Sequence, residues 1–495
     1  MSSILPFSHW GWSFILLYLL SLILIGYIAK KSKVSDSLED YYLAGRNFGP
    51  IVLILTLYAT QYSGNSIFGV SGNAYRLGYT WLVGVHYMLA IVMGYLLFAG
   101  KLHKLSKVHQ FLTPSDYLFY RFRSKSLCTL ASMIMIICLS NYFLAQLMTM
   151  GRAFQGLAGD YGDIAYDYGV IMLALIMVIY GTLGGIRAIA WTDMIQGLVL
   201  ISGLIFLIIL VRYHFGPLEQ VNEIIYERSG EFFLDPPKAP MLREWISYMI
   251  VIGLGGALYP HAMQRIFAAK NIKTLYKSLS VMSFMPYTTA LIALIAGLYA
   301  LAYIPGLEGS NADQALASLL RLIQETSIFG GILVVIIFAA FLAALMSTAD
   351  SAMLTISSMF IKDIFPQRSG EYDQSNVNFG KRLSWILVSV LVLLAILLKD
   401  HASLIAVMDR KFDLLVQLVP AFIISLHYKF LSAKPVFYGL LFGVLISLVL
   451  AFIPFSFIEN GKFYGFHPGV VALPINILIA IFGSLRFKLR PFKYT

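Results

Sequence analysis

Cysteine is nearly absent from this chain, which has only two in 495 residues. Cys128 and Cys138 fall in one predicted helix, where about ten residues separate them by about 15 Å, too far for a disulfide. No cysteines and histidines cluster at the spacing of a metal site, and no low-complexity linker divides the chain. These absences exclude a disulfide scaffold and a zinc module, and they predict a single domain.

Charged residues are scarce as well. They make up 12% of the chain against 59% apolar residues, and the mean hydropathy is +0.78. This composition predicts an integral membrane protein. The formal net charge of +11 could indicate a nucleic-acid partner, but the basic residues follow the membrane topology described below. We therefore expect contact with the lipid bilayer and no nucleic acid.

Motifs of enzymes are missing too. The chain has no GxSxG or HExxH motif and no paired intramembrane aspartates at suitable helix ends, and Ser347 has no evident general base. We therefore predict that the protein is not an enzyme.

Long apolar runs are abundant instead. About thirteen of them are long enough to cross the roughly 30 Å hydrocarbon layer, and long unbroken runs indicate helices rather than barrel strands. The predicted segments cover approximately 11–30, 49–73, 79–100, 127–150, 166–185, 190–212, 244–263, 278–304, 327–350, 383–399, 402–427, 435–455 and 466–485.

Basic residues are distributed unevenly between the two sides of the predicted membrane. With the N-terminus outside, 25 of the 36 Lys and Arg residues fall in inside loops and the C-terminal tail, and 9 fall outside. Cytoplasmic loops are enriched in Lys and Arg, so this asymmetry predicts the N-terminus outside and the C-terminus in the cytoplasm. The first apolar segment lacks a basic n-region and a cleavage site, which indicates a retained helix rather than a signal peptide.

Two predicted spans are interrupted by residues that a lipid-facing helix avoids. The second carries a polar stretch from Gln61 to Ser66, and the seventh carries three glycines over 251–265 and then Pro260. For each span alone, helix packing or a tolerated kink explains the interruption equally well. Because the two lie at corresponding positions of two halves, they predict an inverted repeat whose broken helices present backbone groups at the midplane.

This arrangement predicts an all-α polytopic membrane protein with about 13 transmembrane helices in five parts. They are an N-terminal helix with the first inside loop (1–47), a first repeat (48–213), an outside loop (214–242), a second repeat (243–427), and two C-terminal helices with an inside tail (428–495).

The segment AALMSTADSAML, residues 343–354, places polar residues after a long apolar run. On a helix, Ala344, Ser347 and Thr348 are spaced i, i+3 and i+4, so one carbonyl and two hydroxyls lie on one stripe. Uncharged oxygens gathered in this way suit a desolvated alkali cation, but small residues also pack membrane helices together, which explains the segment alone at least as well. Asp350 falls on another face, either at the cytoplasmic end of an ion path or in a solvated or capping role.

Five motifs occur in order along the chain: DYYLAGR at 40–46, SGNSIFGVSGNAYRLG at 63–78, YGTLGGIRAIAWTDMIQG at 180–197, PHAMQRIFAAKN at 260–271 and AALMSTADSAML at 343–354. Together they resemble the sodium/solute symporter family, which includes sodium/proline, sodium/pantothenate, sodium/monocarboxylate and sodium/glucose carriers. The resemblance covers roughly residues 40–425. It implies a LeuT-like core of five plus five helices with broken first and sixth core helices.

The resemblance implies a sodium site between the first and eighth core helices. Aligned on the second and fifth motifs, the ion's ligands are the carbonyl oxygens of Ala59, Tyr62 and Ala344 and the hydroxyls of Ser347 and Thr348. Five neutral oxygens can replace the hydration shell of sodium and still release the ion.

The resemblance also implies that Asp193 is a waypoint for the ion leaving toward the cytoplasm. Thr192 and Asp193 lie near a predicted helix start, so they could instead accept hydrogen bonds from its N–H groups, and the two roles are compatible.

Substrate contacts are expected from the broken helices and their neighbours. The candidates are Ser63, Asn65 and Ser66 in the second span, and His86, Asn141 and Tyr259 in the third, fourth and seventh spans, where an interhelical hydrogen bond is the simpler role. The polar stretch lacks the acid of proline carriers, and Ser66 stands where sugar carriers have glutamine. Both departures disfavour those substrates.

A charged cluster, Asp409, Arg410, Lys411 and Asp413, lies inside the predicted span 402–427. Charges at this depth are costly, which indicates a function. Arg410 and Asp413 could neutralise each other in an outer-gate network. Alternatively, Arg410 or Lys411 binds a substrate carboxylate, and the bidentate geometry of guanidinium favours Arg410.

The expected function is sodium-coupled uptake of a small organic solute, a carboxylate or zwitterion, by alternating access. Sodium binding would raise the affinity for the solute, and the solute would raise the affinity for sodium. Proton coupling is an alternative, and so is a solute sensor acting through a partner, although no signalling module follows the last predicted span. We expect a monomer in the plasma membrane, the inner membrane of a bacterium.

Overall fold

The computed structural model describes residues 7–32, 37–158, 162–326, 328–365, 374–399, 404–453, 458–459 and 461–488. Within these residues the regular structure is helical except for one antiparallel hairpin of β1 (Ile458–Glu459) and β2 (Lys462–Phe463). The helices up to residue 229 are α1 (His9–Lys31), α2 (Leu38–Leu43), α3 (Pro50–Gln61), α4 (Asn65–Leu77), α5 (Val83–His109), α6 (Pro114–Phe122), α7 (Lys125–Ala158), α8 (Gly162–Phe215) and α9 (Leu218–Ser229). The later helices are α10 (Ala239–Ala257), α11 (Pro260–Ala268), α12 (Ile272–Met282), α13 (Met285–Thr288), α14 (Ala290–Tyr303), α15 (Ala315–Gln324), α16 (Ile328–Met359), α17 (Gln374–Leu397), α18 (Leu404–Leu415), α19 (Ser425–His427), α20 (Ala433–Phe452) and α21 (Pro468–Lys488). Short 3-10 or π turns are η1 (Ala44–Arg46), η2 (Gly78–Leu82), η4 (Gly309–Gln314), η5 (Phe360–Ile364), η6 (Val416–Leu418) and η7 (Pro420–Ile424).

Where the structure describes them, the predicted apolar segments are mostly helical. In the described part of the chain, 9 helices are long and apolar enough to cross a bilayer, or up to 10 if the bent pair α10 and α11 is one span. This count is below the predicted thirteen partly because α8 runs through two predicted spans. Its 54 residues would form a straight helix of about 80 Å, far more than one crossing needs. Gly185 interrupts the helical geometry of α8 with φ 61°, and a Cβ there would lie 2.6 Å from the carbonyl oxygen of Tyr41. Only glycine fits this junction between two helical halves.

The two predicted interruptions are present. Helix α3 ends at Gln61, α4 begins at Asn65, and Tyr62 between them leaves helical geometry with φ −97° and ψ 79°. Helices α10 and α11 are bent by 49° at the residues between Ala257 and Pro260. Because Pro260 lacks an N–H and helix ends leave backbone groups without helical partners, each break exposes polar backbone inside the bundle.

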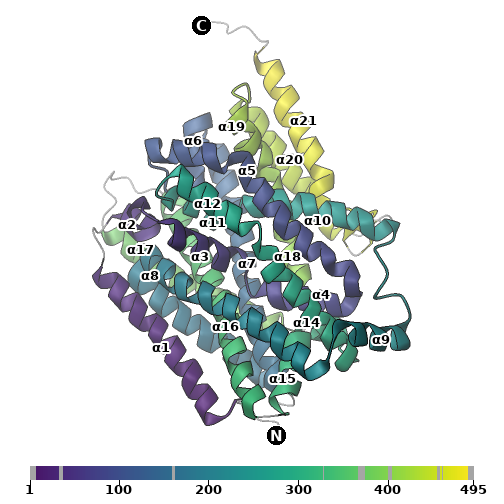
Figure 1. Ribbon diagram of the computed structural model, residues 1–495. Helices are drawn as coiled ribbons and strands as arrows, with labels where there is room; N and C mark the ends of the chain where they lie inside the picture. Colours follow the sequence, from purple (N-terminus) through teal and green to yellow (C-terminus); the bar gives the residue numbers. More distant parts are fainter. Residues whose placement is uncertain are drawn as a thin grey trace, which may run out of the picture.

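Helix α16 is central to the bundle, since every side chain from Ile337 to Met359 is buried. It packs against α3, α7, α8 and α11. Polar residues on a helix buried on all faces contact protein rather than lipid. Figure 1 shows α1 along one edge of the molecule and α20 with α21 at the opposite, upper end.

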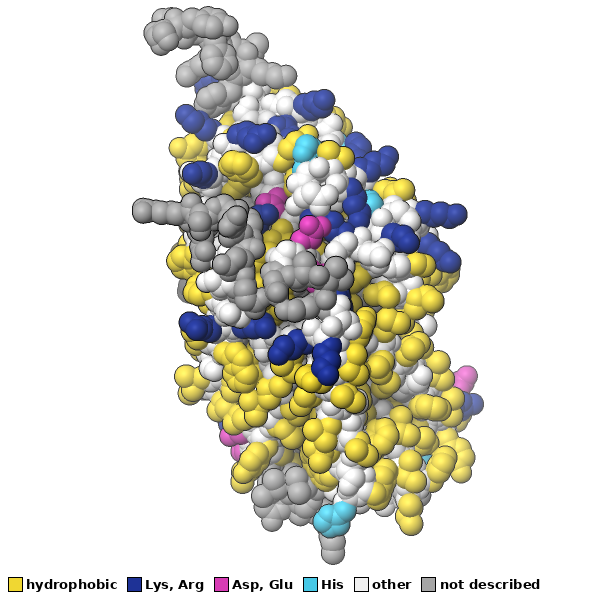
Figure 2. Space-filling model, turned by 90° about the vertical axis from the view of Figure 1, so that its left-hand side faces the viewer, with side chains coloured by type: hydrophobic (Ala, Val, Ile, Leu, Met, Phe, Trp, Pro, Cys, Tyr) yellow, Lys and Arg dark blue, Asp and Glu magenta, His cyan; other side chains and the backbone are white. Residues whose placement is uncertain are grey.

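The surface divides into a basic end and an apolar region. Figure 2 shows Lys and Arg side chains gathered mainly over the upper half of the molecule, whose top holds α6, α19 and the end of α21 in Figure 1. Hydrophobic side chains cover much of the lower part (Figure 2). Large apolar side chains are exposed on α1 and α17, among them Leu17, Leu24, Ile386 and Leu393. Exposed apolar surface of this extent is typical of contact with lipid.

Gly64, in the first break, is expected to tolerate no side chain. A Cβ there would lie 2.2 Å from Cγ of Leu345 on α16, so Gly64→Ala forces α16 away from the break. Overpacking of this kind costs about 1–3 kcal/mol, and we expect a lower melting temperature in detergent. The control is Gly49→Ala, where a Cβ meets nothing within 4 Å. Equal melting temperatures of the two variants contradict this packing.

Candidate functional site

The hydroxyl groups of Ser347 and Thr348 on α16 face the last turn of α3. Ser347 donates a hydrogen bond to the carbonyl oxygen of Ala59 at 2.8 Å, and the Thr348 hydroxyl lies 3.2 Å from the same oxygen. The two hydroxyls also lie 3.2 Å and 3.0 Å from the carbonyl oxygen of Ala344. All four residues are fully buried. Two carbonyls and two hydroxyls therefore converge at one point between α3 and α16.

Tyr62, the fifth residue of the predicted sodium site, is buried in the break itself. Its ring packs against Tyr58 with ring centroids 5.2 Å apart. The carbonyl oxygen of Thr60 lies 3.5 Å from the Thr348 hydroxyl and joins the oxygen group. Of the five residues predicted to bind sodium, the structure brings the oxygens of four together, namely Ala59, Ala344, Ser347 and Thr348. It adds the carbonyl oxygen of Thr60 to this group.

These oxygens are all uncharged, which suits a monovalent cation. Among the described residues, no three His, Cys, Asp or Glu side chains gather as calcium or a transition metal requires. A hydroxyl that donates to a carbonyl also has lone pairs to offer a cation. The group therefore presents neutral carbonyl and hydroxyl oxygens only.

Asp193 on α8 forms a buried ion pair that its sequence position alone did not indicate. Its Oδ2 accepts hydrogen bonds from Thr56 on α3 and, at 3.3 Å, from Nη2 of Arg265 on α11. Nε of Arg265 donates to Thr56 at 3.0 Å. Thr192 and Asp193 lie inside α8, where Thr192 donates to the carbonyl of Ile189 at 2.9 Å, so the capping role is wrong. The buried pair instead ties together the helices that carry the two breaks.

Asp350 is the second buried acid near Arg265. Tyr180 on α8 donates to its Oδ2 at 2.6 Å, and Ser351 lies 3.3 Å from Oδ1. Ser351 also accepts a hydrogen bond from Arg265. Because Asp350 is fully buried, the solvated role considered for it is wrong.

An aromatic cluster joins the second break to α7 and α18. The rings of Tyr142 and Tyr259 stack with centroids 4.9 Å apart, and His261 lies 4.9 Å from Tyr259. Phe412 meets Tyr259 edge-on at 5.6 Å. The ammonium of Lys411 lies over the Tyr142 ring, 3.9 Å from its centroid. The sequence predicts roles for Tyr259 and Lys411 but not for Tyr142 or His261, because aromatic residues are common in apolar helices.

The other predicted substrate residues lie in different parts of the bundle. Ser63 and Ser66 are buried at the first break, and Asn141 precedes Tyr142 on α7. His86 is exposed and packs against Trp245 with ring centroids 5.2 Å apart, outside the aromatic cluster. The side chains of Asn65 and Asp409 lie outside the described residues.

Arg410 points away from the aromatic cluster. Its Nη1 donates to the carbonyl of Gly461 in the β1–β2 hairpin at 3.2 Å and lies 3.6 Å from Asp413 Oδ2. His467 Nδ1 lies 3.7 Å from the other carboxylate oxygen of Asp413. This geometry matches the ion network considered for Arg410.

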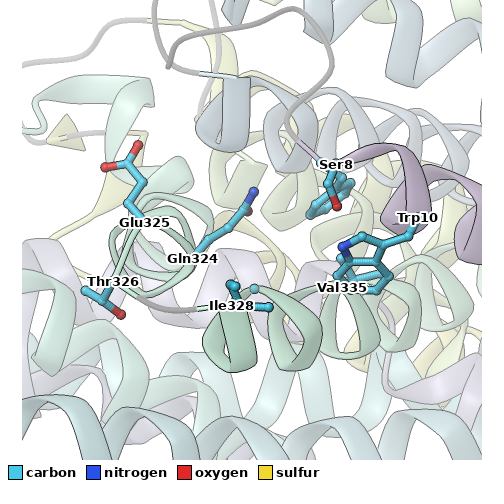
Figure 3. Close-up of a pocket in the computed structure, with 9 residues that line it drawn as sticks. Ser8, Trp10, Gln324, Glu325, Thr326, Ile328 and Val335 are labelled. Carbon is cyan, nitrogen blue, oxygen red and sulfur yellow. The ribbon is translucent and has the colours of Figure 1, made fainter.

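A cavity of about 410 Å³ lies elsewhere, between the start of α1, the end of α15 and the start of α16. Figure 3 shows Trp10, Gln324 and Val335 among its lining residues. None of the predicted site residues lines it. It is therefore separate from the oxygen group.

Comparison with known proteins identifies the family. Residues 41–443 match the family described as "Sodium:solute symporter family". The chain belongs to this family. As a member, it is a multi-pass membrane transporter of small solutes and not an enzyme, and the family couples transport to Na⁺.

Relatives of this symporter family member are similar over nearly the whole chain. The sodium/pantothenate symporter of Escherichia coli (strain K12) is 26% identical over 471 residues, covering 92% of each chain. The osmoregulated proline transporter OpuE of Bacillus subtilis (strain 168) is 26% identical over 484 residues, covering 96% of this chain and 94% of OpuE. The solved structure of a Na⁺-coupled sialic acid symporter in a substrate-bound outward-open state has a TM-score of 0.77 at 17% identity, covering 96% of this chain and 97% of that chain. Mhp1, a nucleobase-cation-symport-1 family transporter, has a TM-score of 0.52 at 13% identity, covering 93% and 97%. These likenesses show a LeuT-like fold.

Proposed function

We propose that the protein takes up a small organic solute, a carboxylate or zwitterion, together with sodium that binds between α3 and α16. The observation that carries the proposal is the convergence of the Ser347 and Thr348 hydroxyls on the Ala59 carbonyl, next to a broken helix. Cation binding there orders the last turn of α3, which leads directly into the break and its serines. Sodium and the solute would therefore both contact the end of α3. Coupling requires that the binding of one ligand changes the binding of the other, and a shared helix end provides this.

We infer a thirteen-span topology with two inverted repeats, 48–213 and 243–427, around this site. The two helix breaks at corresponding positions support the repeats. The concentration of Lys and Arg over the upper half of the molecule supports a cytoplasmic upper face, with the N-terminus outside and the C-terminus inside (Figure 2). The remaining parts, 1–47, 214–242 and 428–495, flank the core, and the proposed functional unit is a monomer.

Alternating access then requires the two breaks to move relative to α8 and α16. The Asp193–Arg265 pair connects α8 to α11 and, through Thr56, to α3. An ion released from the oxygen group toward the cytoplasm passes next to this pair in the proposed scheme. Asp193 is therefore a proposed waypoint for the ion.

A proteoliposome experiment tests sodium coupling. We expect a sodium gradient directed inward to accelerate uptake of a carboxylate such as pantothenate, because the neutral oxygen group binds the driving ion. A proton gradient of equal size without sodium is expected to have little effect. If the proton gradient alone drives uptake, the two buried aspartates, Asp193 and Asp350, become the coupling site and the sodium proposal fails.

A further inference from the structure

The ammonium of Lys411 is enclosed by aromatic rings. Its Nζ lies 3.9 Å from the ring centroid of Tyr142, 5.0 Å from that of Phe412 and 5.8 Å from that of Tyr259. The side chain is 1% exposed. A lysine is rarely buried so completely in a membrane bundle unless its charge is used.

The rings around Lys411 belong to the same machinery as the oxygen group. Tyr259 forms the second break, and the hydroxyl of Tyr142 lies 3.4 Å from the carbonyl oxygen of Thr60, to which it donates. Ser63 and Thr348 lie beside the same hydroxyl. Tyr142 therefore contacts the lysine with its ring and the end of α3 with its hydroxyl.

Several buried polar atoms around the two breaks have no hydrogen-bond partner among the described residues. They include the hydroxyls of Tyr62 and Tyr259, Oδ1 of Asn141 and both ring nitrogens of His261. Buried polar groups are nearly always satisfied, so such a concentration points to a polar ligand or water at this place. The two breaks themselves, Tyr62 to Ser66 and Leu258 to Tyr259, contain no acidic residue.

We propose that Lys411 binds the carboxylate of the transported solute, and that the rings of Tyr142 and Tyr259 contact the solute's apolar part. A carboxylate forms a stronger contact with an ammonium than an aromatic face does. Lys411 also covers the ring faces that an ammonium on the solute would need. The site therefore accepts organic anions and rejects amines and amino acids. This inference rests on the proposed symport function and narrows its substrate class.

The test compares acids with their uncharged counterparts on purified protein in sodium chloride. The probes are pantothenate against pantothenol, propionate against propionamide and benzoate against benzamide, together with proline, and the readout is the shift in melting temperature. We expect stabilisation by at least one acid and by no counterpart or amino acid. If no acid stabilises the protein more than its counterpart, or if proline stabilises it equally, the inference is overturned.

Three substitutions test whether Lys411 is the residue that binds the acid. Lys411→Met is expected to weaken binding of the acid at least about tenfold, because the ammonium that contacts the carboxylate is removed. Lys411→Arg keeps the charge and is expected to retain part of the binding. Arg410→Met is the control that removes the neighbouring positive charge, and it should change the affinity for the acid less than about twofold. Unchanged affinity in Lys411→Met, or loss in Arg410→Met alone, contradicts the assignment.

The same assay distinguishes the role of Lys411 in binding the acid from the proposed coupling to sodium. If acids stabilise the protein equally when choline replaces sodium, sodium coupling fails while the role of Lys411 stands. Tyr142→Phe keeps the ring and removes the hydroxyl that reaches Thr60. We expect this variant to bind the acid but to lose most of the enhancement that sodium gives, whereas full enhancement contradicts a coupling role of Tyr142.

Discussion

Ser347→Ala is expected to raise the sodium concentration that half-activates uptake by about tenfold or more, which corresponds to about 1.4 kcal/mol. The substitution removes an oxygen that lies 2.8 Å from the Ala59 carbonyl, at the point where α16 meets α3. The side chain is fully buried, so bulk water does not directly replace this oxygen. Solute affinity at saturating sodium should change much less, because Ser347 contacts the end of α3 and not the aromatic cluster. The measurement is the sodium dependence of initial uptake rates in proteoliposomes.

Thr348→Ala is expected to act in the same direction, since its hydroxyl lies 3.2 Å from the same carbonyl. The matched control is Ser278→Ala, which removes a buried hydroxyl that donates to the carbonyl of Thr274 in its own helix. The control should keep the wild-type sodium dependence. If both core variants lower the maximal rate without changing the sodium dependence, the two hydroxyls serve helix packing and the sodium assignment is wrong.

Local spacing was enough to predict that these oxygens lie on one stripe of the helix, whereas their role in binding sodium came from the family resemblance and stays a prediction. Ser347 and Thr348 follow Ala344 by three and four residues, so helix geometry alone places their oxygens on one stripe. The polar stretch after Gln61 likewise predicted where α3 ends, because serine, glycine and asparagine weaken a helix. Both features depend on residues close together in the chain.

The sequence could not predict contacts between residues far apart in the chain, or the direction in which a helix points each side chain. Arg265 and Asp193 are 72 residues apart, and only the packing of α11 against its neighbours brings them together. Arg410 and Lys411 are adjacent, and about 100° of helix rotation separates them. One points to the β1–β2 hairpin and the other into the aromatic cluster. Chemistry alone favoured the guanidinium, whereas the orientation of α18 favours the lysine.

The two buried cations of the core have different surroundings. Lys411 packs against the rings of Tyr142, Phe412 and Tyr259. Arg265 is one cation shared among Asp193, Thr56 and Ser351, with a second buried acid, Asp350, next to Ser351. Removing this cation leaves buried negative charge behind. A large loss of stability is therefore expected when Arg265 is replaced by an uncharged residue.

Arg265→Met is expected to destabilise the protein by about 3–5 kcal/mol, the cost of leaving a buried charge without its partner. The argument rests on burial, since Arg265 is 1% exposed and Asp193 is fully buried. A lower melting temperature in detergent and a lower yield of folded protein are the expected results. The control is Arg321→Met, which removes the exposed partner of Glu325 and should cost less than about 1 kcal/mol.

A double variant separates the structural role of this pair from its role in transport. Adding Asp193→Asn to Arg265→Met removes the uncompensated charge, so much of the lost melting temperature should return. Uptake should stay low, because the proposed ion path has lost its acid while Ser347 and Thr348 are intact. Recovery of both stability and sodium-driven uptake in the double variant means that Asp193 only neutralises Arg265. Recovery of stability alone assigns the carboxylate to the ion path, next to the helix junction that alternating access must move.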